Sequence, residues 1–570
     1  MGRIVGIDLG TTTSEIAYIK NGKPELIINR ESVVPTITPS IVGLDNDMKP
    51  LVGDPAKNQM AYAKDRTIQE VKRLMGTEKN VLLAGKKFTP VEISTLILKK
   101  LKSVAEEYLN EEITGAVITV PANFNEAQRQ ATKEAGEKAG FVVERIINEP
   151  TAAALAFGID NIETEGKILV YDLGGGTFDV TVLEMIENSL DVRSSRGVNI
   201  LGGKDFTQKI TDEIVNRFKE EFEIDLSEDE KAYARVKEEA EKAKVALSAV
   251  ASVKIYLSFI AFKDGQPISY ETELTRTRYE QLIIEYINKS METVDEALKS
   301  AKISEDEIDI VLAVGGSSRT PLVLEKLKER FGNKIRGGIN PDEAVSLGAA
   351  VQAGLLSNEI SGSGSIAIFD VCNHTLGTAI YDKEKDRHEY SRIIMRDTHI
   401  PFAKTRSYET VNDFQTTVRI SVYQGESDDV FQNTEIGNFI VEDIPENYAG
   451  KETVDIEFKY NEDGMLDVNV TVVSTGKVTS QKFDMTPYDP QTGKSEVDIA
   501  TMDGYEHSED VKTTMQLYQS YRNNLPENIK QQADALMNEL KQAIVENDVQ
   551  RIEELDELLT AIIFDNISFS

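Results

Sequence analysis

The sequence predicts a multidomain protein in which a duplicated α/β unit is followed by a strand-rich block and a helical tail. Three observations lead to this fold class. A chain of 570 residues with 40% hydrophobic composition can fill several cores, so three or four domains are expected. Two similar turns, each between apolar strands, stand about one domain apart. Alternating strand patterns occupy the region after residue 371, and helical periodicity follows it.

The two repeated turns predict phosphate-binding hairpins. One runs Asp8-Leu-Gly10-Thr11-Thr12 after the strand that begins near Ile4, and the other runs Asp172-Leu-Gly174-Gly175-Gly176-Thr177-Phe-Asp179. Glycine lets backbone N–H groups approach an anion, threonine adds a donor, and aspartate suits a hydrated divalent ion. An ordinary glycine turn explains either copy alone. Two matching copies favour a nucleotide held in a cleft between two halves.

The bulk charge limits the possible ligands. A formal net charge of −34 repels nucleic-acid backbones and anionic membranes, so we expect no nucleic acid and no membrane as partner. The single cysteine, Cys372, excludes an intramolecular disulfide, and the first apolar strand starts too close to Met1 to leave room for a signal peptide. These features predict a reducing, cytoplasmic location and a small anionic ligand neutralised by metal.

Between the two hairpins the chain predicts alternating helices and strands. Residues 69–76 are interpreted as the end of a helix that carries Lys72, and residues 90–109 have helical spacing. Residues 115–121 form an apolar strand stopped by proline, and residues 125–140 form another helix. Glu149 precedes Pro150 at the start of a small-residue helix, where an acidic cap is the ordinary alternative to a catalytic role.

Several motifs in one order make the chain resemble the seventy-kilodalton heat-shock chaperones, the DnaK family. Besides the two hairpins they are Asn148-Glu-Pro-Thr-Ala-Ala-Ala, Leu201-Gly202-Gly203-Lys-Asp205-Phe, Ala240-Glu241-Lys-Ala-Lys244-Val-Ala-Leu-Ser248, Val314-Gly315-Gly316-Ser317-Ser318-Arg319-Thr-Pro321 and Asn340-Pro341-Asp342-Glu-Ala-Val. The resemblance implies an actin-like, ribonuclease H-like duplicated ATPase over residues 1–358, with small subdomains at about 40–90 and 202–280. It also implies a linker over 359–370, a β-sandwich that binds peptides over 371–483 and a shortened helical lid over 505–570.

The resemblance assigns roles to residues of the ATPase. It implies ATP/ADP and Mg²⁺ as cofactors, usually with K⁺. Asp8 and Asp172 would hold hydrated Mg²⁺, and Lys72 would reach the γ-phosphate. Glu149, Asp172 and Asp179 would orient the attacking water or the hydration of the metal. Thr177, grouped with these catalytic residues, would bind a phosphate oxygen through its hydroxyl. The remaining nucleotide contacts would come from Gly10, Thr11, Thr12, Gly174, Gly175, Gly176, Gly202, Gly203, Glu241, Lys244, Ser248, Gly315, Gly316, Ser317, Arg319 and Asp342.

The second part of the chain departs further from the family pattern. Residues 366–370 are similar to the family's leucine-rich linker, and the strand of the next domain is the alternative. By position, the peptide groove would be lined by Thr378, Tyr381, Tyr408, Val411, Val418 and Ile420. A proline-containing run of the family is replaced at Asp370–Gly377, and a glycine turn is replaced by the charged stretch 382–389. Client preference is therefore open. Three helices are predicted at about 508–523, 527–547 and 548–564.

We expect an ATP-dependent chaperone that binds exposed apolar segments of unfolded polypeptides and couples hydrolysis to closure of a clamp. The resemblance implies a J-domain cochaperone, docking near Arg145, Asn148 and the linker residue Asp370, and a GrpE-like nucleotide exchange factor. A divergent relative with one dedicated protein partner is the main alternative. A sugar kinase or an actin-like filament protein would explain only residues 1–358.

Overall fold

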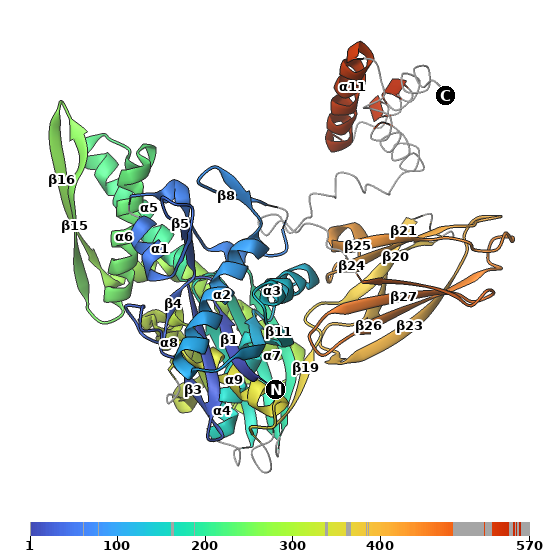
Figure 1. Ribbon diagram of the computed structural model, residues 1–570, viewed down its shortest axis with the longest axis horizontal. Coiled ribbons are helices and arrows are strands. Elements are labelled where there is room, and N and C mark those ends of the chain that lie inside the picture. Colours follow the sequence, from blue (N-terminus) through green and yellow to red (C-terminus); the bar gives the residue numbers. More distant parts are fainter. Residues whose placement is uncertain are drawn as a thin grey trace.

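The structure is a computed structural model (Figure 1). It describes residues 2–60, 62–77, 79–160, 165–186, 189–336, 340–360, 366–382, 385, 387–482, 518, 527–546, 551–552, 555 and 558–559.

The first large sheet contains the N-terminal glycine hairpin. Its strand order is β11-β10-β1-β2-β3, with β4 paired to β2. The pairs β1–β10 and β10–β11 are parallel, whereas β1–β2 and β2–β3 are antiparallel. The strands are β1 (Arg3–Leu9), β2 (Thr13–Lys20), β3 (Lys23–Leu26), β4 (Thr38–Pro39), β10 (Ile113–Val120) and β11 (Val142–Asn148). Helices α2 (Pro90–Leu109) and α3 (Glu126–Lys138) share an apolar core with this sheet.

The second large sheet contains the other hairpin and has the order β18-β17-β12-β13-β14-β19-β22. Asp172 pairs with Asp179 across its β12–β13 hairpin. The strands are β12 (Gly166–Leu173), β13 (Phe178–Ile186), β14 (Ser189–Val198), β17 (Ile310–Val314), β18 (Ile335–Arg336), β19 (Ala367–Val371) and β22 (His399–Ile400). Helices α4 (Glu149–Asp160) and α9 (Ala344–Leu356) share one core with residues from both large sheets, which places them between the sheets (Figure 1).

Smaller elements surround these sheets. The core on the other side of the second sheet includes residues of α5 (Gly203–Phe222), α6 (Glu230–Leu247), α7 (Arg276–Ala301), α8 (Pro321–Phe331) and the hairpin of β15 (Ser252–Lys263) and β16 (Gln266–Thr275). Near the first sheet lie α1 (Asp54–Met60), β5 (Ile41–Leu44), β6 (Pro50–Val52), β7 (Thr67–Gln69), β8 (Val81–Leu83) and β9 (Lys86–Phe88). The prediction of a helix end over 69–76 is wrong: Lys72 lies in a short 3₁₀ helix, Val71–Leu74, directly after β7. There Lys72 forms a buried ion pair with Glu149, from a segment far away in the sequence.

The strand-rich block forms two four-stranded sheets, β21-β20-β24-β25 and β23-β26-β27-β28, which share one apolar core. Their strands are β20 (Leu376–Asp382), β21 (Arg387–Ile394), β23 (Phe402–Glu409), β24 (Val418–Gln424), β25 (Thr434–Val441), β26 (Thr453–Tyr460), β27 (Leu466–Val472) and β28 (Lys477–Lys482). The predicted turn at residues 461–464 joins β26 to β27.

In the C-terminal region the structure describes α11 (Glu527–Glu546), which begins where the middle lid helix is predicted. The two flanking lid helices fall largely on residues outside those described, so they stay predictions. No helix among the described residues has both the length and the apolarity needed to cross a membrane.

Candidate functional site

The two glycine hairpins approach each other closely. A Cβ added to Gly175 would lie 2.2 Å from the Thr12 hydroxyl, and one added to Gly176 would lie 3.0 Å from a side-chain carbon of Thr11. Gly315, at φ +78°, has no room either, since its Cβ would lie 2.5 Å from the carbonyl oxygen of Leu173. The glycine turns and threonine hydroxyls of the two sheets therefore lie side by side, and such glycine turns can present backbone amides to a phosphate.

Four carboxyl groups surround one lysine beside these hairpins. Lys72 Nζ lies 2.5 Å from Glu149 Oε1, and both side chains are nearly buried. Burial, followed by the charge of Glu149, raises the pKa of Asp8 to about 7, although Lys72 and a 3.1 Å hydrogen bond from Thr119 oppose the shift. The same two causes raise the pKa of Asp179 to about 8. Such crowded carboxyl groups have a strong affinity for a cation that neutralises them.

Asp172 gives an observation that fits a metal ion. Its Oδ2 is buried and has no hydrogen-bond partner, and burial raises its pKa well above the usual value, with Glu149 contributing next. Within the described part of the chain, however, no three acidic, histidine or cysteine side chains converge closely enough to form a direct metal cage. The donor set therefore fits a cation that keeps much of its water, which is how Mg²⁺ binds beside phosphates.

The residues predicted for the nucleoside side lie around Gly203 and Gly316. Lys244 donates to the Gly203 carbonyl at 2.9 Å and to Glu241 at 2.8 Å. Ser317 donates to the Gly174 carbonyl at 2.8 Å, so this wall contacts the phosphate hairpin. The other predicted members of the wall lie in neighbouring turns: Ser248 caps α6, Gly202 caps α5, and Arg319 pairs with Asp342 at 2.9 Å.

Sequence reasoning missed two residues here. Arg73 donates to the Gly176 carbonyl at 3.0 Å and to Asp205 at 3.2 Å, so it connects the 3₁₀ helix to the opposite sheet. Thr119, at the end of β10, orients Asp8. The two adjacent cations at positions 72 and 73 are a weak indication that Arg73 has a role at the site. No local pattern distinguishes Thr119 from other threonines in buried strands.

The three predicted interdomain residues lie along one interface. Asn148 donates to Asp370 at 3.0 Å and accepts a 2.6 Å hydrogen bond from Arg129, while Arg145 pairs with Glu462 at 3.4 Å. Burial raises the pKa of Asp370. Asn148, which contacts the linker, immediately precedes Glu149, which pairs with Lys72.

The linker segment belongs to both parts of the fold. Strand β19 pairs in parallel with β14 through residues 367–369 and antiparallel with β22 through Asp370 and Val371. The two interpretations of this apolar run, a docking linker and a first strand, therefore describe the same segment.

Further contacts extend this interface. Asp463, in the β26–β27 turn, accepts a hydrogen bond from the Ile146 amide at 3.2 Å and pairs with Lys133 at 3.2 Å. Arg196 on β14 binds both carboxylate oxygens of Asp397 at 2.9 and 2.7 Å. The sequence pattern identified neither contact, since their partners are separated by some 200 residues or more.

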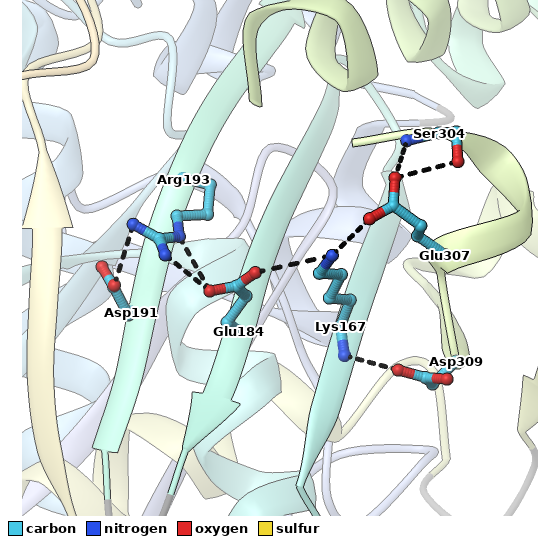
Figure 2. Close-up of polar contacts among 7 residues, drawn as sticks. All are labelled: Lys167, Glu184, Asp191, Arg193, Ser304, Glu307 and Asp309. Atoms are coloured by element: carbon cyan, nitrogen blue, oxygen red, sulfur yellow. Dashed lines mark hydrogen bonds and ion pairs between the residues drawn. The ribbon is translucent and has the colours of Figure 1, made fainter. Parts of the chain in front are cut away.

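A row of charges crosses the second sheet and ends at the same interface (Figure 2). Lys167 lies between Glu307 at 2.6 Å and Glu184 at 3.9 Å. Arg193 continues the row from Glu184 to Asp191, and Asp191 also lies 2.7 Å from Nε2 of His399 on β22. Most members are partly exposed, so each pair contributes little stability by itself.

The predicted groove residues occupy three environments. Thr378 and Ile420 are buried, and Thr378 donates to the Ser421 carbonyl at 2.8 Å. Tyr408 and Val418 are partly buried and pack against the sandwich core. Val411 is partly buried, and Tyr381 is exposed with its ring against that of His388. Their role in peptide binding stays a prediction.

Comparison with known proteins identifies the family. The family model described as Hsp70 protein matches residues 4–82 and 78–567. Chaperone protein DnaK of Thermosipho melanesiensis is 41% identical over 577 residues, which cover 97% of this chain and 95% of the relative. The proteins of the same name from Thermotoga neapolitana and Thermotoga petrophila are 41% and 40% identical over 97% of this chain and 94% of each relative. Because the family model and these relatives span nearly the whole chain, it belongs to the Hsp70 family of ATP-dependent chaperones with ATPase activity.

Proposed function

We propose that this chain couples ATP hydrolysis between its two glycine hairpins to the opening and closing of a peptide clamp formed by residues 371–483. The observation that carries the proposal is the continuous contact from Lys72 through Glu149 and Asn148 to Asp370 of the linker. A nucleotide-dependent shift of Glu149 would also move Asn148, its neighbour in the chain, and Asn148 contacts Asp370 of the linker. Coupling of about 1–3 kcal/mol between the two sites is enough for useful switching.

In this proposal Asp8 and Asp172 hold hydrated Mg²⁺, and K⁺ is a further cofactor beside them. The ion supplies charge neutralisation for the phosphates. The amides of Gly10, Gly174, Gly175 and Gly176 and the hydroxyls of Thr11, Thr12 and Thr177 bind phosphate oxygens. Lys72 binds the terminal phosphate, while Glu149 and Asp179 orient the attacking water. The nucleoside is bound by Glu241, Lys244, Ser248, residues 315–319 and Asp342. Among these, Arg319 stacks on the base.

The linker and the sandwich carry the second half of the function. The structure supports a docked arrangement, in which β19 adds to the second large sheet and the sandwich touches β11, α3 and β14. We propose that this arrangement holds the clamp open, and that its release returns β19 to the sandwich. The clients are unfolded polypeptides with exposed apolar segments, since a buried leucine contributes about 1.5–3 kcal/mol.

The partners proposed are a J-domain cochaperone near Arg145, Asn148 and Asp370, and a GrpE-like exchange factor at the ATPase, in the cytoplasm. The sequence matches almost the full length of relatives named Chaperone protein DnaK, and this name mentions no particular client. The match argues against a dedicated partner, a sugar kinase or a filament protein.

Stopped-flow release of a fluorescent apolar peptide tests the proposed coupling. The full chain is loaded with peptide in the presence of ADP and then mixed with ATP or with ADP. We expect ATP to accelerate release by at least about tenfold, as a coupling above 1.4 kcal/mol requires. Intact ATP hydrolysis without any peptide binding would contradict the proposal.

The shortened lid gives a separate prediction. We propose that the lid, about residues 505–570, is shortened, so that fewer residues cover the bound peptide. Its dissociation in ADP should then be faster than from a relative with a long lid, by about tenfold for each 1.4 kcal/mol of lost contact. Dissociation rates of one labelled peptide from both proteins provide the measurement. Equal rates would show that the short lid encloses the peptide as well as a long one does.

A further inference from the structure

Strand β23 carries two cations, the partly buried Lys404 and the exposed Arg406, opposite core residues of β26. Its register with β26 places Lys404 opposite Phe458, Arg406 opposite Ile456 and Tyr408 opposite Val454. The three β26 residues are core residues. Side chains two residues apart on a strand point to the same face, so Lys404, Arg406 and Tyr408 share one side of β23.

Arg406 and Tyr408 meet a hydroxyl of the other sheet at this edge of the sandwich. The Tyr408 hydroxyl lies 2.7 Å from Ser391 Oγ, and Arg406 donates to the same oxygen at 3.2 Å. Ser391 pairs with Thr378 across β20 and β21. Two of the proposed groove residues, Thr378 and Tyr408, are therefore joined to Arg406 through Ser391.

Neither cation has an ion-pair partner within the described part of the chain, although the protein carries a net charge of −34. Two other cations of the sandwich do have such partners: Arg387 pairs with Glu389, and Arg392 pairs with Asp428. The acidic residues beside β23 occupy the alternate positions of β26, where Asp455 accepts from Ser407 at 2.6 Å. They therefore lie on the other face of the sheet.

A positive charge that faces an apolar groove without a carboxylate partner selects for a negative one on the ligand. We propose that the clamp prefers apolar client segments that carry an aspartate or glutamate next to the residue held at Tyr408, with Arg406 and Lys404 as the residues that determine this preference. The inference rests on the proposed function, because it requires that peptides bind beside Tyr408. The client carboxylate would accept hydrogen bonds from the guanidinium of Arg406, which also approaches Ser391. The ammonium group of Lys404 would attract the same carboxylate.

Three labelled peptides test the preference. They share one leucine-rich sequence and differ at a single position beside the central leucine, which is Glu, Gln or Lys. Fluorescence anisotropy with the full chain and ADP gives each affinity. We expect the Glu peptide to bind about fivefold more tightly than the Gln peptide, the upper range for a partly exposed ion pair, and the Lys peptide to bind more weakly than both. The preference should decrease between 50 and 500 mM KCl.

Variants then assign the preference to its residues. Arg406→Gln should reduce the Glu-to-Gln ratio to below about twofold, and Lys404→Gln/Arg406→Gln should remove it. Lys459→Gln is the matched control, because Lys459 is exposed on the neighbouring strand and lies opposite Ala403, on the other face. It should leave the ratio unchanged. None of these variants touches the nucleotide site, so each should keep the basal ATPase rate.

The outcomes separate this inference from the function on which it depends. Equal binding of the three peptides, tighter binding of the Lys peptide, or a preference that persists in the double variant would overturn the inference and leave the chaperone function intact. Failure of all three peptides to bind, with ATP hydrolysis retained, would overturn both.

Discussion

Replacement of Lys72 by alanine is expected to lower the rate of ATP hydrolysis by about 100-fold or more, while ATP affinity changes only a few fold. The reason is the position of the ammonium group, which pairs with Glu149 beside Asp8, Asp172 and Asp179. A positive charge in such a dry site stabilises charge that develops on the transferred phosphoryl group, and single groups of this kind contribute about 10²–10³-fold. The adenosine contacts that we propose lie elsewhere, around Gly203 and Gly316.

Single-turnover hydrolysis and titration with a fluorescent nucleotide separate the two effects. The experiment needs several Mg²⁺ concentrations, because Lys72 lowers the pKa values of Asp8 and Asp179, and its loss changes the charge that the metal meets. Lys167→Ala is a suitable control, since that lysine lies at the opposite end of β12 from Asp172 and pairs with Glu307 (Figure 2). Near-normal turnover in the Lys72 variant would refute its role.

The same substitution leaves the buried Glu149 without its partner. Removing one member of a buried pair costs about 3–5 kcal/mol, so the variant could lose activity by unfolding. Thermal denaturation with and without ATP distinguishes the causes: a folded variant gains stability from ATP, as any ligand of the native state provides. Lys72→Met keeps the side-chain volume against Phe124 and serves as a second variant.

Short sequence patterns predicted the elements whose structure depends mainly on residues close to one another in the chain. Helix α2 has the predicted bounds because Thr89 and Glu92 form a capping box and Pro90 follows the cap. The β12–β13 hairpin follows in the same way from three glycines between two apolar strands, and the β26–β27 turn from Asn461 and Gly464. Each of these signals lies within a few residues of the structure that it determines.

Contacts between distant segments were harder to predict. The turn chemistry of residues 461–464 predicts the turn but not that Asp463 in it would bind the Ile146 amide. Lys72 was assigned its role through the family, whereas the local pattern suggested a helix end that the structure replaces with a 3₁₀ turn. Arg73 and Asp397 have partners more than a hundred residues away, and a single sequence does not record such pairings.

Separation of Arg196 from Asp397 is expected to abolish ATP-accelerated peptide release. Both side chains are largely buried, and Arg196 is held by both oxygens of the carboxylate. When the sandwich leaves the second sheet, Arg196 and Asp397 are both exposed to water again. Loss of one partner therefore destabilises only the docked arrangement, in which the other stays buried. A cost of about 3–5 kcal/mol exceeds the usual coupling between two sites of 1–3 kcal/mol, and the docked arrangement would no longer be populated.

Asp397→Asn and Arg196→Met are the appropriate variants. Asp397 has a φ of 63°, a conformation that asparagine tolerates well, so the first removes charge without backbone strain. Arg217→Gln is the control, because Arg217 also pairs with a carboxylate, Glu213, but on its own helix α5. Stopped-flow measurements should show release after ATP addition at the ADP rate in both variants, with hydrolysis retained, and normal acceleration in the control. Normal acceleration in all three would mean that the contacts of Asp370 with Asn148 and Thr151 are sufficient to hold the docked arrangement.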